Sequence, residues 1–186
     1  MRTSMAEAAT RLLDLLDTGD RAAAQYGFAD DKARRWIEYR PEARPGLCLA
    51  QVPVAARKAA HQLLATALSP HAYAQAMAVV GLEEVLDRAE GGRRGRHSGD
   101  YWISVFGDPA GERWGWRFEG HHLSVSLTVD GAEVYPSPLF LGANPATVRY
   151  AGHPVLRPLA LEEEVARALL DALRPAQRER AVLPGP

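Results

Sequence analysis

The stretch WGWRFEGHHLSVSLTVDG, residues 114 to 131, decides the fold of this chain because it joins two strand patterns that disagree in phase. Successive side chains of a strand point to opposite faces, so a change of phase needs an extra residue or a break. Glycine tolerates the backbone angles of a bulge. We therefore predict a β-bulge at Gly120, with a plain turn at Glu119–Gly120 as the alternative. The apolar side chains fall on even numbers before this glycine and on odd numbers after it: Trp114, Trp116 and Phe118, then Leu123, Val125, Leu127 and Val129.

The same irregularity gathers polar side chains. With a bulge, His121 lies at the break and the polar face of the sheet carries Arg117, Glu119, His122, Ser124 and Ser126. With a plain turn, the two histidines begin the next strand on opposite faces. Either arrangement keeps one carboxylate near at least one imidazole. We expect this polar face to be open or to line a pocket.

The patterns on either side of this stretch indicate an α+β fold. Alternation of apolar and polar residues over 101–136, with an Asp-Gly hairpin signal, predicts an antiparallel β-meander. Helical spacing of apolar residues predicts a helical part over 1–90 and a C-terminal helix over 160–174. We expect one domain, residues 1–186, in which helices from both chain ends pack on one face of the meander. Five aromatic side chains are expected to form the core under the helices: Trp102, Phe106, Trp114, Trp116 and Phe118.

The composition is that of an ordinary soluble protein, with 47% hydrophobic and 24% charged residues and a net charge of −1. So small a net charge provides no field that would recruit nucleic acid or an anionic membrane. No stretch is long and apolar enough to span a bilayer, and the N-terminus lacks a secretory pattern. The single cysteine, Cys48, excludes internal disulfides and a thiolate-rich zinc site. We expect a cytoplasmic protein with no nucleic-acid or membrane partner, and the oligomeric state stays open.

The polar cluster offers ligands for a transition metal. A carboxylate with neutral imidazoles suits zinc, copper or iron, so Glu119, His121 and His122 are the candidate metal ligands. Their spacing matches no specific metal motif. On this hypothesis the protein is a metal-dependent oxidase or hydrolase, and a further ligand must come from elsewhere in the chain. The candidates for that ligand are His61, His71, Glu83, Glu84 and His153.

Three other interpretations need no metal. His121 or His122 could act as a general acid or base, with Glu119 fixing its tautomer and Arg117 holding an anionic substrate group; Arg117 and His122 are thus the candidate catalytic residues. The same face could instead bind a small-molecule anion or a partner chain without catalysis, or could be only a solvated surface of weak ion pairs. The loop GGRRGRH, residues 91–97, has arginines that could grip a phosphate or carboxylate, or it is simply a mobile connection.

Two helical stretches of the chain are similar to each other. EAATRLLDLLDTGDRAAA, starting at Glu7, and EVARALLDALRPAQRERA, starting at Glu164, share the leucine pair, the aspartate after it, a later leucine and a later arginine. Amphipathic helices resemble one another, which accounts for the similarity without any repeat. The alternative is a repeated helix–turn unit.

The run YWISVFGDPAGERWGWRFEGHHLSVSLTVDG, followed by PLFLGANPATV, resembles the family known as domain of unknown function 3500 (DUF3500). The upstream stretch RRWIEYRPEARPGLCL is similar to it as well, so the resemblance covers nearly the whole chain. It implies no stated activity. Its members typically continue well past the helix that ends here near Leu173, so the resemblance implies that this chain is shortened and would lack any C-terminal segment that completes a site. The family typically has asparagine at Ser126, which argues against a polar role for that serine.

Overall fold

The structure is a computed structural model that describes residues 2–183. The α+β class, with helices at both ends of the chain, is confirmed. The chain contains two compact units, Met1–Pro145 and Ala146–Pro186, and each is described by itself.

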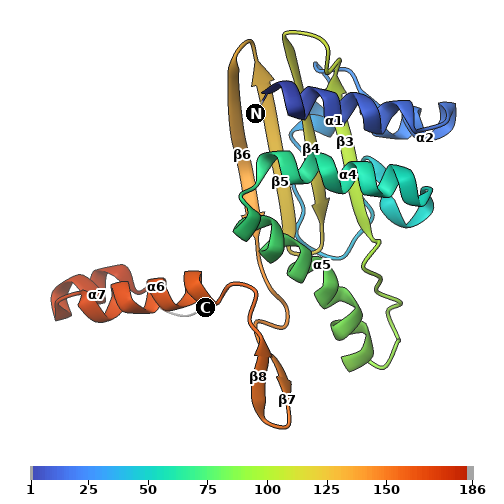
Figure 1. Ribbon diagram of the computed structural model, residues 1–186. Helices are drawn as coiled ribbons and strands as arrows, with labels where there is room; N and C mark the ends of the chain where they lie inside the picture. The colour runs from blue at the N-terminus through green and yellow to red at the C-terminus, as the bar shows by residue number, and fades with distance from the viewer. Residues whose placement is uncertain (1, 184–186) are drawn as a thin grey trace. The chain divides into compact units, whose positions relative to one another are not determined.

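The first unit contains an antiparallel meander with helices on one face (Figure 1). The sheet order is β1-β3-β4-β5-β6; β2 also pairs with β3, and β1 pairs with β3 in parallel. The predicted meander of residues 101–136 is therefore present and extends to Leu141. Its helices are α1 (Arg2–Asp14), α2 (Thr18–Ala24), α3 (Asp31–Arg34), η1 (Leu49–Gln51), α4 (Val54–Ala67) and α5 (Pro70–Ala89). Its strands are β1 (Gln25–Tyr26), β2 (Leu47–Cys48), β3 (Tyr101–Gly107), β4 (Arg113–Gly120), β5 (Leu123–Asp130) and β6 (Glu133–Leu141).

The change of phase near Gly120 comes from a tight hairpin. Strands β4 and β5 pair without interruption from Gly120 opposite Leu123 to Arg113 opposite Asp130. The loop between them is the pair His121–His122, and His122 adopts a positive φ of 57°. A two-residue loop pairs each even-numbered residue with an odd-numbered one, which produces the observed change of phase. The predicted bulge at Gly120 is therefore wrong, and so is a turn at Glu119–Gly120.

The face of the sheet beneath α1, α4 and α5 carries the hydrophobic core (Figure 1). Trp114, Trp116 and Phe118 are fully buried there, in one cluster with Leu12 of α1 and Leu64 of α4. Burying a large apolar side chain contributes about 1.5–3 kcal/mol. These side chains therefore dominate the packing of the first unit, as the sequence predicted.

The opposite face of the sheet is covered by the connector, residues 27–46, which runs from β1 to β2 and includes α3. The prediction that Trp102 and Phe106 lie under the helices is wrong, because β3 pairs Trp102 with Glu119 and Phe106 with Gly115, on the connector face. The expectation of an open polar face is wrong as well, since Arg117 and Glu119 are each 1% exposed beneath the connector.

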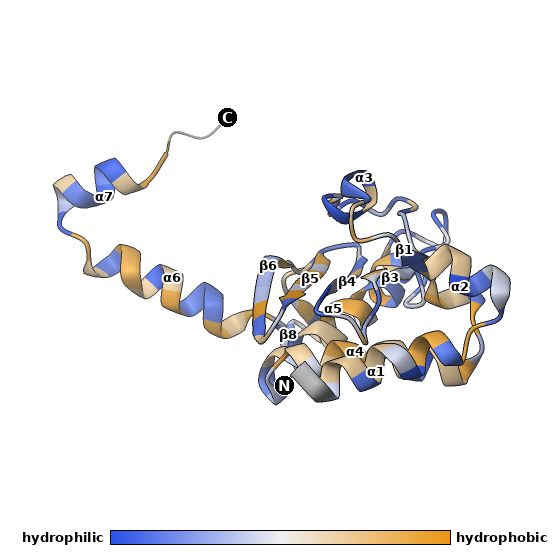
Figure 2. Ribbon diagram, turned by 90° about the horizontal axis from the view of Figure 1, so that it is seen from above, coloured by the Kyte–Doolittle hydropathy of each residue, from blue (hydrophilic) through white to orange (hydrophobic). Residues whose placement is uncertain are grey.

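The second unit consists of a hairpin and two helices. Strands β7 (Val148–Tyr150) and β8 (His153–Leu156) pair antiparallel, and α6 (Ala160–Ala172) and α7 (Pro175–Ala181) follow. Apolar and polar residues alternate along α6 (Figure 2), yet no residue of either helix is buried. Across residues 2–183, no helix has the length and apolar character needed to cross a membrane.

Candidate functional site

Arg117 of β4 fastens the connector to the sheet. Its Nη1 donates hydrogen bonds to the backbone oxygens of Ala33, Arg34 and Trp36, at 2.8, 3.3 and 2.9 Å. The last turn of a helix leaves carbonyl oxygens without partners, and a cation is favourable there. The buried guanidinium provides hydrogen-bond donors and a positive charge to the end of α3 and to the residues that follow it. Arg117 is thus placed as an internal tether of the backbone.

Arg44 does the same at the other end of the connector. Its guanidinium donates to the backbone oxygens of Glu42, Arg40 and Glu38, at 2.6, 2.5 and 3.1 Å. It also lies over the ring of Trp102, with its Cζ 5.5 Å from the ring centroid. The side chain is fully buried, so the loop wraps around its own arginine.

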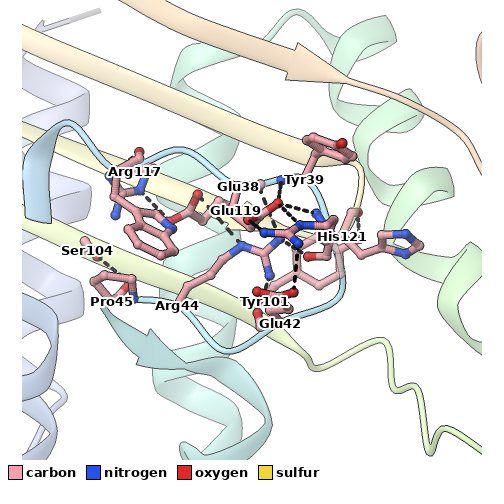
Figure 3. A network of polar contacts seen from close by, with 12 residues as sticks. Glu38, Tyr39, Glu42, Arg44, Pro45, Tyr101, Ser104, Arg117, Glu119 and His121 are labelled. Carbon is pink, nitrogen blue, oxygen red and sulfur yellow. Dashed lines mark hydrogen bonds and ion pairs between the residues drawn. The ribbon is translucent and has the colours of Figure 1, made fainter. Parts of the chain in front are cut away.

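Glu119 of β4 lies between these two arginines (Figure 3). Its Oε1 is 2.7 Å from Nε of Arg117, and its Oε2 is 3.9 Å from Nε of Arg44. Burial raises the pKa of Glu119 to about 7, against the lowering effect of the two guanidinium groups. The carboxylate is therefore enclosed by cations, which is an environment unsuited to a metal ion.

His121 faces a different part of the molecule. Its imidazole points away from the Glu119 carboxylate in Figure 3, and its Nδ1 is paired with Oε1 of Glu83, which lies on α5. The Tyr101 hydroxyl donates to the backbone oxygen of His121 at 2.9 Å. Oε2 of Glu83 is 3.7 Å from Nη1 of Arg96. Glu83 of α5 thus contacts both His121 of the hairpin turn and Arg96 of a loop.

Arg96 comes from the glycine-rich loop that the sequence marked as a possible anion grip. It forms a two-pronged ion pair with Glu90, at 2.9 and 3.0 Å. Its Nη1 is buried and makes no hydrogen bond within residues 2–183. Arg94 lies in the same loop with a largely exposed side chain, 3.7 Å from Glu90.

These groups line a pocket of about 480 Å³. Its walls include Arg44, Glu83, Arg94, Arg96, Asp100, Trp102 and His121. Burial raises the pKa of Asp100, which favours the neutral form of that carboxyl group. A concave site with one aromatic wall and a few convergent polar groups is the usual form of a small-molecule site.

His122 lies beside this pocket. Its ring centroid is 4.1 Å from that of His121 and 6.4 Å from that of Phe140. Its backbone N–H donates to the Tyr39 oxygen at 3.1 Å, and its own oxygen accepts from Gly142 at 2.7 Å. Burial, followed by the neighbouring His121, lowers the pKa of its imidazole. Its role in the structure is to hold the hairpin turn between the connector and the end of β6.

The structure thus brings together only part of the predicted site. His121 and His122 are adjacent, but Glu119 and Arg117 are enclosed under the connector. Glu83, which the sequence offered only as a possible further metal ligand, is the carboxylate that contacts His121. Within residues 2–183, no three His, Cys, Asp or Glu side chains are arranged to hold a metal ion.

The part of the site that sequence reasoning missed is Arg44, whose folded-back loop had no local signal. Arg96 had one, the three arginines among glycines at 91–97. Two other candidate ligands of the first unit do not line the pocket: His61 packs on Phe118 in the core, and Glu84 accepts a hydrogen bond from the backbone of Ser98.

Comparison with known proteins gives a family and nothing finer. A family model described as a protein of unknown function, DUF3500, matches residues 1–185. No curated protein and no solved structure is significantly similar to the chain.

Proposed function

Since the chain belongs to the DUF3500 family of proteins of unknown function, we propose its function from the pocket itself: the protein binds a small anionic molecule there, and His121 transfers a proton to or from it. On this proposal the reaction needs no contribution from Glu119 or Arg117. Those two residues shape the wall against which the pocket is built.

The contact between Glu83 and His121 is the observation that carries the proposal. A carboxylate that accepts a hydrogen bond from Nδ1 fixes the tautomer of an imidazole and leaves Nε2 as an acceptor. His121 lines the pocket, and on this proposal Nε2 is the nitrogen that meets a bound molecule. A positioned imidazole of this kind contributes about 10²- to 10⁴-fold in rate as a general acid or base.

The charges around the pocket favour an anion. In its wall, Glu83 already contacts His121 and Arg96, Glu42 is paired with Arg40, and burial raises the pKa of Asp100. Arg94 lines the pocket with most of its side chain exposed. Arginine binds carboxylates and phosphates through its fork of donors. Trp102 offers a flat apolar wall beside it.

Hydrolysis of p-nitrophenyl acetate, an activated ester, tests the proton-transfer step. We expect the wild-type protein to hydrolyse it at least about tenfold faster than His121→Ala. His153→Ala is the control, since His153 is an exposed histidine of β8. Equal rates for the two variants would remove His121 from the mechanism.

Inorganic phosphate tests the binding step separately. We expect it to raise the melting temperature of the wild-type protein and to have a smaller effect on Arg94→Ala. Arg93→Ala is a control within the same loop, because Arg93 does not line the pocket. Stabilisation by phosphate without any ester hydrolysis would indicate a binding module rather than an enzyme.

A metal-dependent oxidase or hydrolase stays a prediction that no contact among residues 2–183 supports. His121 and His122 are close enough to share an ion, but a third ligand does not accompany them. Elemental analysis of untagged protein for zinc, copper and iron tests this version. A stoichiometric metal that is lost in His122→Ala would favour it over the metal-free reaction.

A further inference from the structure

The helix pair α6–α7 repeats the helix pair α1–α2. Each pair is a helix of 13 residues followed by one of seven. When Glu7 is aligned with Glu164, α2 (Thr18–Ala24) coincides with α7 (Pro175–Ala181) at both ends. The similarity noticed in the sequence therefore extends to the helix boundaries.

The two pairs differ in what covers them. In α1, Leu12 and Leu13 are 0% and 2% exposed, and this helix packs against α4. The residue aligned with Leu12 is Leu169, which is 63% exposed. Leu12 is thus buried in the first pair, whereas the aligned Leu169 is exposed in the second pair.

Helix α6 carries a continuous apolar stripe. Leu161, Val165 and Leu169 are spaced by four residues, so they lie on one side of α6, and they are 57%, 59% and 63% exposed. Soluble proteins seldom leave such a stripe uncovered along a whole helix. At Leu169 a partner of α-helical form is indicated, because the aligned Leu12 lies in a helix that packs against α4.

The stripe is symmetric about its middle residue. Leu161 and Leu169 are equally far from Val165. If two α6 helices lie antiparallel about a two-fold axis at Val165, each Leu161 meets the Leu169 of the partner and the two valines meet each other. A self-complementary patch of this kind is what a two-fold dimer interface requires.

The charges select the same arrangement. The first turn of α6 is acidic, with Glu162 and Glu163, whereas the chain beyond its C-terminal end is basic, with Arg174, Arg178 and Arg180. An antiparallel pair brings the acidic turn of each helix near the basic end of the other. A parallel pair would place the acidic turns side by side, and aligned helix dipoles would add to the repulsion.

We propose that α6–α7 is a self-association surface, through which two copies of this chain form a dimer with antiparallel α6 helices and Val165 on the two-fold axis. The proposal is independent of the pocket beside His121. It names a second copy as the partner because both the spacing of the stripe and the order of the charges are self-complementary.

Sedimentation equilibrium of the full chain over a wide concentration range tests the dimer. The wild-type protein is expected to dimerise, and Val165→Glu is expected to weaken the dimer by at least about 100-fold, since it places two carboxylates at the centre of an apolar contact. Val155→Glu in β8 is the matched control, because Val155 is 60% exposed and lies outside α6; it should leave the dimer unchanged.

Cross-linking tests the orientation in a Cys48→Ala background. A mixture of Leu161→Cys and Leu169→Cys chains should form a disulfide-linked heterodimer, and neither chain should cross-link efficiently to itself. A wild-type chain that stays monomeric at all concentrations would overturn the proposal. A dimer that survives Val165→Glu, or one that cross-links Leu161→Cys chains to each other, would overturn it as well.

Discussion

Replacing Arg117 by methionine should destabilise the first unit far more than its single position suggests. Methionine keeps a long apolar stem but removes every donor. Three backbone oxygens, at 2.8, 3.3 and 2.9 Å from Nη1, then lose this donor. Glu119, whose Oε1 is 2.7 Å from Nε of Arg117, loses its nearer cation. A hydrogen bond to a charged group contributes about 1.5–3 kcal/mol, and removing one member of a buried ion pair costs about 3–5 kcal/mol.

These terms overlap because the same guanidinium makes all the contacts, so we expect a total loss of about 3–5 kcal/mol. For a chain of this length, that corresponds to a fall in melting temperature of about 6–20 °C. Urea unfolding followed by tryptophan fluorescence measures the loss directly, because Trp114 and Trp116 are fully buried in the native state.

Arg113→Met is the matched control for this experiment. Arg113 lies on the same strand, and its Nη2 is 2.7 Å from Oδ2 of Asp130, but the two side chains are 61% and 44% exposed. An exposed pair contributes about 0–1 kcal/mol. Trypsin adds a local test, since the connector contains several arginines and should be cut faster in Arg117→Met. A loss within about 1 kcal/mol of the control, with unchanged cleavage of the connector, would refute the tether.

Three further changes test other parts of the first unit. Burial lowers the pKa of His61, so the neutral imidazole is favoured in the fold. Its contribution to stability is present above the unfolded pKa of 6.5 and is lost as the pH falls toward the folded pKa. In urea unfolding between about pH 7 and 5, His61→Gln should therefore lose less stability than the wild type. The pKa of Glu119 is raised to about 7, so its contribution to stability is complete below the unfolded pKa of 4.5 and is lost as the pH rises through about 7. Glu119→Gln should flatten the decline in unfolding free energy between about pH 5 and 8. An unchanged slope would contradict the raised pKa. A Cβ at Gly120 would lie 2.3 Å from Cδ1 of Tyr101, so Gly120→Ala should cost about 1–3 kcal/mol in thermal unfolding. The control is Gly81→Ala in α5, where a Cβ meets nothing within 4 Å, and it should stabilise the protein by about 0.5–1 kcal/mol.

The sheet could be predicted from the sequence, but the cause of its change of phase could not. Apolar residues move from even to odd positions both at a one-residue bulge and across a two-residue hairpin loop. The phase pattern alone therefore cannot separate the two. The positive φ of His122 could not be predicted either, because nothing in the local sequence requires it.

The candidate site was only partly predictable for a different reason. Arg117 and Glu119 alternate with apolar residues, which is the pattern of an exposed polar face. What buries them is a connector more than 70 residues earlier in the chain, through contacts such as Arg117 to Ala33. Likewise Glu83 reaches His121 from a helix 38 residues away. Local periodicity carries no information on such pairings.

The tautomer of His121 is the most direct test of the proposed site. Two-dimensional NMR of protein with ¹⁵N-labelled histidine, recorded at about pH 8 where a neutral imidazole dominates, reports which ring nitrogen carries the proton. If Glu83 holds Nδ1–H, the wild-type protein should show His121 protonated at Nδ1 with Nε2 bare, and Glu83→Ala should shift it toward the Nε2–H form. A wild-type His121 protonated at Nε2 would leave no base facing the pocket and would contradict the proposal.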